Sequence, residues 1–195
     1  MKRIKFLSSP SLEAQIASIS DDIAYNSHDL EDGLKSNLFK LKDLEKIPIL
    51  KNIIFKHKKQ IKYHSIDLVI RQIVREIINE MVKDVIITTQ NNIKKKKIKN
   101  LSDVYKSKYP IVVFSKNMSQ FDKKVKLFLR KKMYYHKSVK LNTNKGKKII
   151  KKLFKSIQKN PSSYLNVSKY DNSNIARSIC DFIAGMTDRY AINLY

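Results

Sequence analysis

The feature that most constrains the fold is a stretch of apolar residues, between positions 66 and 85, spaced three and four apart. Its members are Ile66, Val69, Ile70, Ile73, Val74, Ile77, Ile78, Met81, Val82 and Val85. An α-helix turns about 100° per residue, so this spacing places the apolar side chains along one side. A helix of this kind buries that side against other elements, and the sequence therefore predicts a packed helical core.

The rest of the chain favours the same class, because 195 residues contain only three glycines and four prolines. Sheet proteins need more turn residues than this. Further helices are predicted at 12–39 (starting from Ser9-Pro10), 119–133, 143–158 and 172–193, with a loop around Pro48 and a short or irregular segment at 101–109. We predict an all-α helical bundle with a boundary near residue 100, whose parts 1–100 and 101–195 can share one core.

The formal net charge is +24, with 41 lysines and arginines against 17 acidic residues. Such an excess favours nucleic acid, anionic lipid or a phosphorylated small molecule as partner. However, the lysines are spread along the whole chain beside many isoleucines and asparagines, a mixture that AT-rich coding DNA also produces. A basic surface that binds nucleic acid, with lysines at 94–97 and 145–152, therefore stays open as an alternative function.

The single cysteine, Cys180, excludes an internal disulfide and a zinc site built from cysteines. One unpaired thiol fits a reducing compartment, and we expect a cytoplasmic protein. No apolar run approaches about 20 residues, so no membrane-spanning segment is expected.

The most informative segment for function runs from Ser20 to Gly33. On a helix, one sector holds Asp21, Tyr25, His28, Asp29 and Asp32, whereas the opposite side holds Ile16, Ile19, Ile23, Leu30 and Leu34. Aspartates three and four residues apart repel one another by a few tenths of a kcal/mol per pair. A metal ion or a sugar hydroxyl would offset this repulsion, while a plain solvated face is the alternative.

Three segments in the same order resemble the bacterial deoxyguanosinetriphosphate triphosphohydrolase-like family. The first comprises residues 10–15, 21–26 and 28–34, the second residues 128–130 and 133–136, and the third residues 179–191. The resemblance implies the C-terminal half of an HD-type phosphohydrolase fold. Residues 1–100 would be the remnant of the HD helical domain, and residues 101–195 the phosphohydrolase-associated region.

The resemblance also implies an activity, namely metal-dependent hydrolysis of a deoxynucleoside triphosphate (dNTP) to the deoxynucleoside and triphosphate. By resemblance, Asp21 is the last of the family's divalent metal ligands (Mg or Mn), with Asp22 as the alternative. Tyr25 packs against the deoxyribose, and Asp29 bonds the sugar 3′-hydroxyl. The dipeptide His28-Asp29 is not the His-Asp metal pair, because that pair precedes this helix in the family.

The family's first histidine and its His-Asp pair lie upstream of the segment with which these residues begin. We therefore expect that this polypeptide alone does not hydrolyse dNTPs, because one or two carboxylates are too few ligands. A homo-oligomer, a separately encoded N-terminal HD half, and a noncatalytic assembly role are all left open. Weaker site candidates are Asp32, His64, Arg71, Arg177, Asp181 and Asp188, and an ion-pair network explains the last three equally well.

Overall fold

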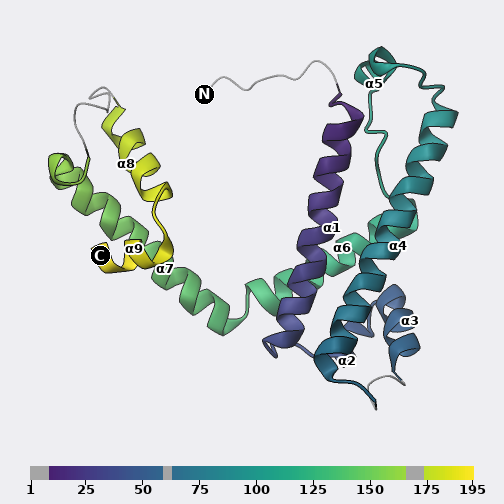
Figure 1. Ribbon diagram of the computed structural model, residues 1–195, viewed down its shortest axis with the longest axis horizontal. Coiled ribbons are helices and arrows are strands. Elements are labelled where there is room, and N and C mark those ends of the chain that lie inside the picture. Colours follow the sequence, from purple (N-terminus) through teal and green to yellow (C-terminus); the bar gives the residue numbers. More distant parts are fainter. Residues whose placement is uncertain (1–8, 59–62, 166–173) are drawn as a thin grey trace. The chain divides into compact units, whose positions relative to one another are not determined.

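The computed structural model describes residues 9–58, 63–165 and 174–195, and every regular element in those ranges is helical (Figure 1). The all-α prediction is confirmed. The chain divides into two compact units, 1–134 and 135–195. Within the described ranges, none of the helices combines the length and apolarity needed to cross a membrane.

The first unit is organised around two long helices, α1 (Leu12–Lys35) and α4 (Ile66–Lys95). They lie side by side and run in opposite directions (Figure 1). The shorter elements of this unit are α2 (Leu41–Leu44), α3 (Pro48–His57), α5 (Leu101–Lys106), α6 (Lys116–Leu129) and the π-helix η2 (Arg130–Tyr134). The helix α3 packs against α4, and α6 packs against α1.

The apolar stripe that predicted α4 supplies much of the core. Its buried members are Val69, Ile70, Ile73, Val74, Ile77, Met81 and Val85. They pack in one cluster with α1 residues such as Leu30 and with α6 residues such as Phe121 and Leu129. Residues on both sides of position 100 therefore share this core, and the division between the two units falls after Tyr134 instead.

Both ends of α1 differ from the prediction. The helix begins after Ser11, whose hydroxyl accepts a hydrogen bond from the Ala14 amide at 3.3 Å, rather than after Ser9. It ends at Lys35 rather than near Phe39, because Asn37 adopts a left-handed backbone with φ of 54°. The chain then turns back and places the Phe39 ring directly over Gly33, where a Cβ atom would overlap it. Only glycine allows this close approach.

The loop predicted around Pro48 is wrong, because Pro48 is the first residue of α3. Proline is well suited to this position, where a missing N–H costs no helical hydrogen bond. The apolar run 111–114 is irregular chain and forms neither a helix nor a strand. Its backbone N–H groups at Ile111 and Val112 instead donate to Gln15 Oε1, at 2.8 and 3.1 Å.

The second unit consists of α7 (Lys137–Lys159), the 3-10 turn η3 (Pro161–Ser163), α8 (Ile175–Ala184) and α9 (Asp188–Leu194). Ile157 and Ile179 are fully buried between α7 and α8. The helix predicted from 143 begins earlier, at Lys137. The single last helix predicted from 172 to 193 is wrong, because α8 ends at Ala184 and a separate helix, α9, begins at Asp188. Residues 172 and 173 lie outside the described residues. Thr187 then caps α9 by accepting from the Tyr190 amide at 3.2 Å.

Candidate functional site

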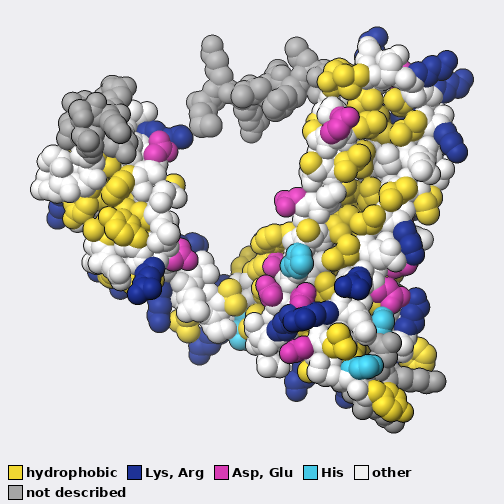
Figure 2. Space-filling model, viewed as in Figure 1, with side chains coloured by type: hydrophobic (Ala, Val, Ile, Leu, Met, Phe, Trp, Pro, Cys, Tyr) yellow, Lys and Arg dark blue, Asp and Glu magenta, His cyan; other side chains and the backbone are white. Residues whose placement is uncertain are grey.

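The polar side of α1 forms the face that the sequence singled out. Asp21, Tyr25 and Asp32 are exposed, with Tyr25 59% accessible, and Asp29 is half-buried. On the opposite side, Ile23, Leu30 and Leu34 are buried. Figure 2 shows acidic side chains gathered beside a histidine over the lower part of α1. The helix therefore presents carboxylates and a phenol outward from a fixed apolar base.

A residue far along the chain joins this face. The Tyr134 hydroxyl donates a hydrogen bond to Asp29 Oδ2, and the Tyr25 phenol is near enough to raise the pKa of Tyr134. Tyr134 is the last residue of η2, a π-helical turn that interrupts the end of α6. Such turns re-aim side chains and are frequent at functional sites. Three residues, Tyr25, Asp29 and Tyr134, are thus linked in one cluster.

The environment of Tyr134 keeps its hydroxyl protonated. Burial raises the pKa of Tyr134 well above its usual range, and the hydrogen bond with Asp29 and the neighbouring Tyr25 phenol raise it further. A protonated phenol can only donate to a carboxylate, so Tyr134 holds one oxygen of Asp29 in place. A carboxylate offers about four acceptor positions, which leaves Asp29 able to accept from a ligand hydroxyl as well.

Asp22 lies in a different environment from Asp21. Lys126 Nζ is 3.2 Å from Asp22 Oδ2 and 3.0 Å from Asp122 Oδ2, while Asn26 donates to Asp122 at 3.1 Å. Burial works against the charge of Lys126, but the hydrogen bonds and charges of the two aspartates outweigh it and raise the pKa of Lys126. Asp22 therefore forms an ion pair that links α1 to α6. The Asp21 side chain makes no hydrogen bond or ion pair with the described residues.

The described residues do not supply a complete set of metal ligands. No group of three or more histidine, cysteine, aspartate or glutamate side chains converges among them. Asp21 can offer one carboxylate, and a catalytic metal site of this chemistry needs further ligands.

No hydrogen bond or ion pair joins the weaker candidates to this cluster among the described residues. Asp32 is on the same face of α1, and Arg71 on α4 lies 3.9 Å from Glu31 of α1. His64 is exposed just before α4 begins. In the second unit, Arg177 donates to Asp181 at 2.9 Å within α8, whereas Asp188 lies on α9 because the predicted last helix is broken. An ion pair therefore accounts for Arg177 and Asp181.

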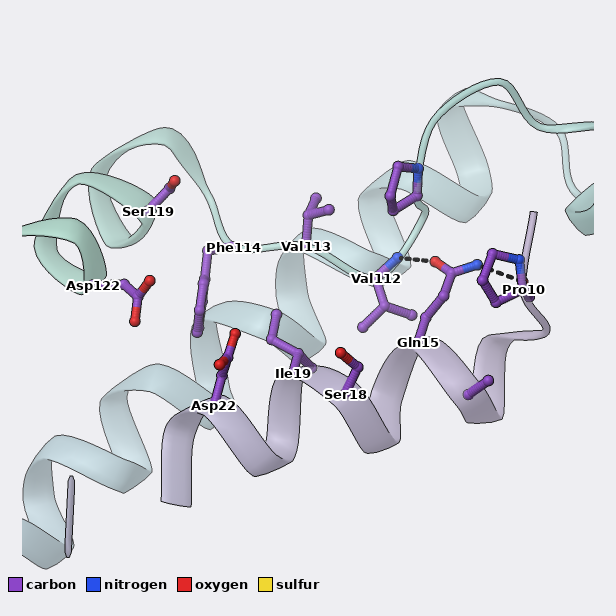
Figure 3. Close-up of a pocket in the computed structure, with 12 residues that line it drawn as sticks. Pro10, Gln15, Ser18, Ile19, Asp22, Val112, Val113, Phe114, Ser119 and Asp122 are labelled. Carbon is purple, nitrogen blue, oxygen red and sulfur yellow. Dashed lines mark hydrogen bonds between the residues drawn. The ribbon is translucent and has the colours of Figure 1, made fainter. Parts of the chain in front are cut away.

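A cavity of about 430 Å³ lies beside α1 (Figure 3). Apolar walls come from residues such as Ile19, Val112 and Phe114, and the Asp22 and Asp122 carboxylates lie at one end. Asp21, Tyr25 and Asp29 do not line it. No sequence pattern indicates this cavity, because its walls come from segments about 100 positions apart.

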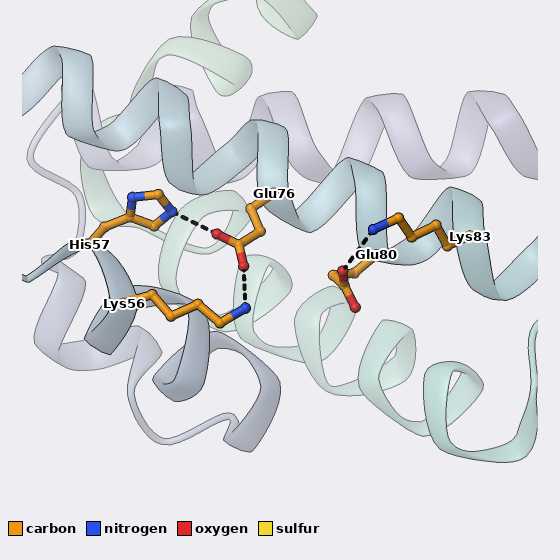
Figure 4. A network of polar contacts seen from close by, with 5 residues as sticks. All are labelled: Lys56, His57, Glu76, Glu80 and Lys83. Atoms are coloured by element: carbon orange, nitrogen blue, oxygen red, sulfur yellow. Dashed lines mark hydrogen bonds and ion pairs between the residues drawn. The ribbon is translucent and has the colours of Figure 1, made fainter.

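A second polar cluster fastens α3 to α4 (Figure 4). The Glu76 carboxylate accepts from Lys56 at 2.6 Å and hydrogen-bonds His57 at 2.6 Å. The bond from Lys56 lowers the pKa of Glu76, and burial only partly opposes this. These bonds join two helices of the core, and they hold the C-terminal end of α3 against the middle of α4.

Apolar side chains also remain exposed on α1 and α4, and Figure 2 shows them gathered along the visible face of these helices. Ile16 on α1 is 48% accessible, and Ile86 and Ile87 on α4 are 50% and 58% accessible. Val82, one turn before Ile86, is exposed as well. Apolar side chains that gather on an exposed face are typical of an interaction surface.

Comparison with known proteins adds independent information. Residues 112–195 match the model of the phosphohydrolase-associated domain. A deoxyguanosinetriphosphate triphosphohydrolase-like protein of Pelagibacter ubique is 50% identical over 192 residues, which cover 98% of this chain and 52% of the relative. Proteins of the same name from Bartonella henselae and Rickettsia typhi are 38% and 36% identical over 191 and 190 residues, covering 47% and 50% of their lengths. This chain spans about half the length of the curated relatives that it matches.

Proposed function

We propose that this chain, which is similar to deoxyguanosinetriphosphate triphosphohydrolase-like proteins along almost its whole length, forms one wall of a dNTP-hydrolysing site. The reaction would convert a dNTP, such as dGTP, and water to the deoxynucleoside and inorganic triphosphate. The observation that carries the proposal is the cluster of Tyr25, Asp29 and Tyr134 on the exposed side of α1.

In this proposal, each residue of the cluster has a separate task. The free acceptor positions of Asp29 bind the 3′-hydroxyl of the deoxyribose, while Tyr134 fixes the orientation of that carboxylate. The exposed ring of Tyr25 offers an apolar surface on which the sugar packs. Binding the sugar at two points orients the triphosphate for attack by water, and orientation of this kind contributes strongly to rate.

Asp21 would contribute one ligand to the divalent metal ion, Mg or Mn, that the family resemblance implies. Both aspartates are exposed, but only Asp22 is paired with Lys126, and this difference supports Asp21 over the alternative ligand Asp22. When bound, such an ion acts as a Lewis acid on phosphoryl oxygens. The remaining ligands would come from protein outside the 195 residues, on the same polypeptide or on a partner.

The exposed apolar face of α1 and α4 supports such a partnership, since packing another helical segment on Ile16, Val82 and Ile86 would remove apolar surface from water. An HD half supplied by a separate chain, or a second copy in a homo-oligomer, would cover these exposed apolar side chains. Cytoplasmic localisation also stays a prediction. A noncatalytic assembly role is the competing proposal, and it predicts co-purification with a protein that carries the HD ligands but no need for Asp21.

Two preparations test the function. A polypeptide of residues 1–195 alone, assayed with dGTP and Mn²⁺ for released triphosphate, is expected to be inactive, because no complete ligand set converges among the residues that the structure describes. A chimera in which residues 1–195 replace the aligned segment of the Pelagibacter relative is expected to hydrolyse dGTP, given 50% identity across the replaced segment. A folded but inactive chimera, or an active isolated polypeptide, would contradict the proposal.

A further inference from the structure

The helix α7 carries an unusual distribution of charge. Its 23 residues contain nine lysines and no acidic residue. These are Lys137, Lys140, Lys145, Lys147, Lys148, Lys151, Lys152, Lys155 and Lys159. At about 100° per residue, all nine fall within a sector of about 160°, whereas Leu153 and Ile157 lie on the other side. We call these nine residues the lysine face.

The arrangement is electrostatically unfavourable by itself. Lysines at spacings of three and four residues, such as Lys148 and Lys152 or Lys151 and Lys155, are neighbours on the helix surface and repel one another by a few tenths of a kcal/mol per pair. No carboxylate on α7 offsets this, and in the second unit Asp181 is paired with Arg177 on α8. A polyanion bound along the lysine face would turn this repulsion into attraction.

The surface along this face is hollowed rather than smooth. Two neighbouring hollows, of about 400 and 560 Å³, share Lys152 and Lys155. An exposed tyrosine accompanies each part of the face: Lys140 Nζ lies 4.6 Å from the Tyr135 ring centroid, and Lys152 Nζ lies 4.9 Å from that of Tyr195. Both rings are 52% accessible. Basic grooves that carry exposed aromatic rings are typical of single-strand binding.

We propose that the lysine face of α7, with Tyr135 and Tyr195, binds single-stranded nucleic acid through its phosphates and bases. A membrane surface is the less favoured partner. A helix that lies in a lipid interface must insert its apolar side, but Leu153 and Ile157 are already buried within the second unit, 2% and 0% accessible. This proposal does not rest on the proposed dNTP hydrolysis. The lysine face shares no residue with the cluster of Tyr25, Asp29 and Tyr134.

The test is fluorescence anisotropy of a labelled 20-nucleotide oligothymidylate with the full 195-residue chain, at KCl concentrations from 50 to 300 mM. We expect affinity to fall steeply with salt. Replacing Lys147, Lys148, Lys151 and Lys155 by glutamine, a good helix former, is expected to weaken binding at least about tenfold at 100 mM KCl. The slope of log K against log salt concentration should fall by about 0.7 for each phosphate that the variant no longer neutralises.

A matched control removes the same four charges elsewhere, by replacing Lys94, Lys95, Lys123 and Lys124 with glutamine. These lysines are exposed on the first unit, and binding should change by less than about threefold if the lysine face is the site. Tyr195→Leu is expected to weaken binding about fivefold without changing the salt slope, because stacking is not electrostatic.

Three results would overturn the proposal. They are equal losses in the two four-lysine variants, no binding by the unaltered chain at 50 mM KCl, and binding to vesicles containing phosphatidylserine without binding to the oligonucleotide. Unchanged binding by Tyr195→Leu, or equal affinity for a duplex of the same length, would overturn the assignment to single strands. Circular dichroism of each variant verifies that α7 remains helical.

Discussion

The helices α1 and α7 are two amphipathic helices of one strongly basic chain, but their polar faces are opposites. The α1 face carries aspartates and has no lysine or arginine before Lys35, whereas the α7 face carries nine lysines and no carboxylate. Asp29 of α1 is held by a residue 105 positions away. The lysines of α7 have mostly local contacts, such as Lys140 with Tyr135.

The difference indicates two kinds of binding. A face whose carboxylate is fixed by a half-buried phenol is preorganised, and preorganisation suits recognition of a small ligand with defined hydroxyl positions. A row of long, solvated lysines fixes no single geometry, but it attracts an extended polyanion through counterion release. Similar chemical changes in the two regions should therefore have different consequences.

The largest expected effect concerns the sugar contact of Asp29. In the active chimera, Asp29→Ala should lower kcat/KM for dGTP about 10- to 150-fold, because a hydrogen bond to a charged group contributes about 1.5–3 kcal/mol. The same variant should scarcely affect 2′,3′-dideoxyGTP, which has no 3′-hydroxyl. Equal losses for the two nucleotides would show that Asp29 acts on the fold and not on the sugar. Lysine substitutions on α7 should leave both values unchanged.

The sequence predicted the α1 face better than the partners of that face. Helical spacing alone places Asp21, Tyr25 and Asp29 on one side, because 100° per residue is a local property. The hydrogen bond from Tyr134 depends on a π-helical turn and on packing between α6 and α1, and no local pattern encodes either. The start of α7 could not be predicted for a related reason, since residues 137–142 are mostly polar and show little apolar periodicity.

The next comparison changes one glycine to alanine in each unit. Gly33→Ala should lower the free energy of unfolding by about 1–3 kcal/mol, because the new methyl group overlaps the Phe39 ring. Gly146→Ala on α7 should raise it by about 0.5–1 kcal/mol, since nothing lies within 4 Å and glycine disfavours a helix interior. Hydrogen exchange of amides in each unit measures the two separately. Changes of the same sign would contradict the packing described for Gly33.

The smallest expected effect is on the ionisation of two tyrosines, Tyr134 and Tyr195. Burial and Asp29 raise the pKa of Tyr134, whereas the hydrogen bond with Lys152 lowers the pKa of Tyr195 from its ordinary value of 10.0. Tyr134 therefore stabilises the fold below about pH 10, and this contribution is lost as pH rises further. For Tyr195 the sign is reversed, and its contribution is present above about pH 10 and lost below.

Absorbance at 295 nm follows these ionisations. Tyr134→Phe should remove a phenol that ionises late in an alkaline titration, and Tyr195→Phe one that ionises early. Tyr135→Phe, which leaves the ring beside Lys140 in place, is the control for the loss of a hydroxyl. If Tyr134→Phe removed a phenol that ionises early, the expected difference in pKa between Tyr134 and Tyr195 would be contradicted.

The most direct test of the acidic face compares two adjacent aspartates in the dGTP-hydrolysing chimera. Asp21 faces outward and is proposed to hold the metal ion, while Asp22 pairs with Lys126. Asp21→Ala should lower kcat about a thousandfold, corresponding to the several kcal/mol that a bound Lewis acid supplies, and Asp22→Ala less than about tenfold. Retained hydrolysis in Asp21→Ala, or a greater loss in Asp22→Ala, would contradict the assignment of α1 as the wall of the catalytic site.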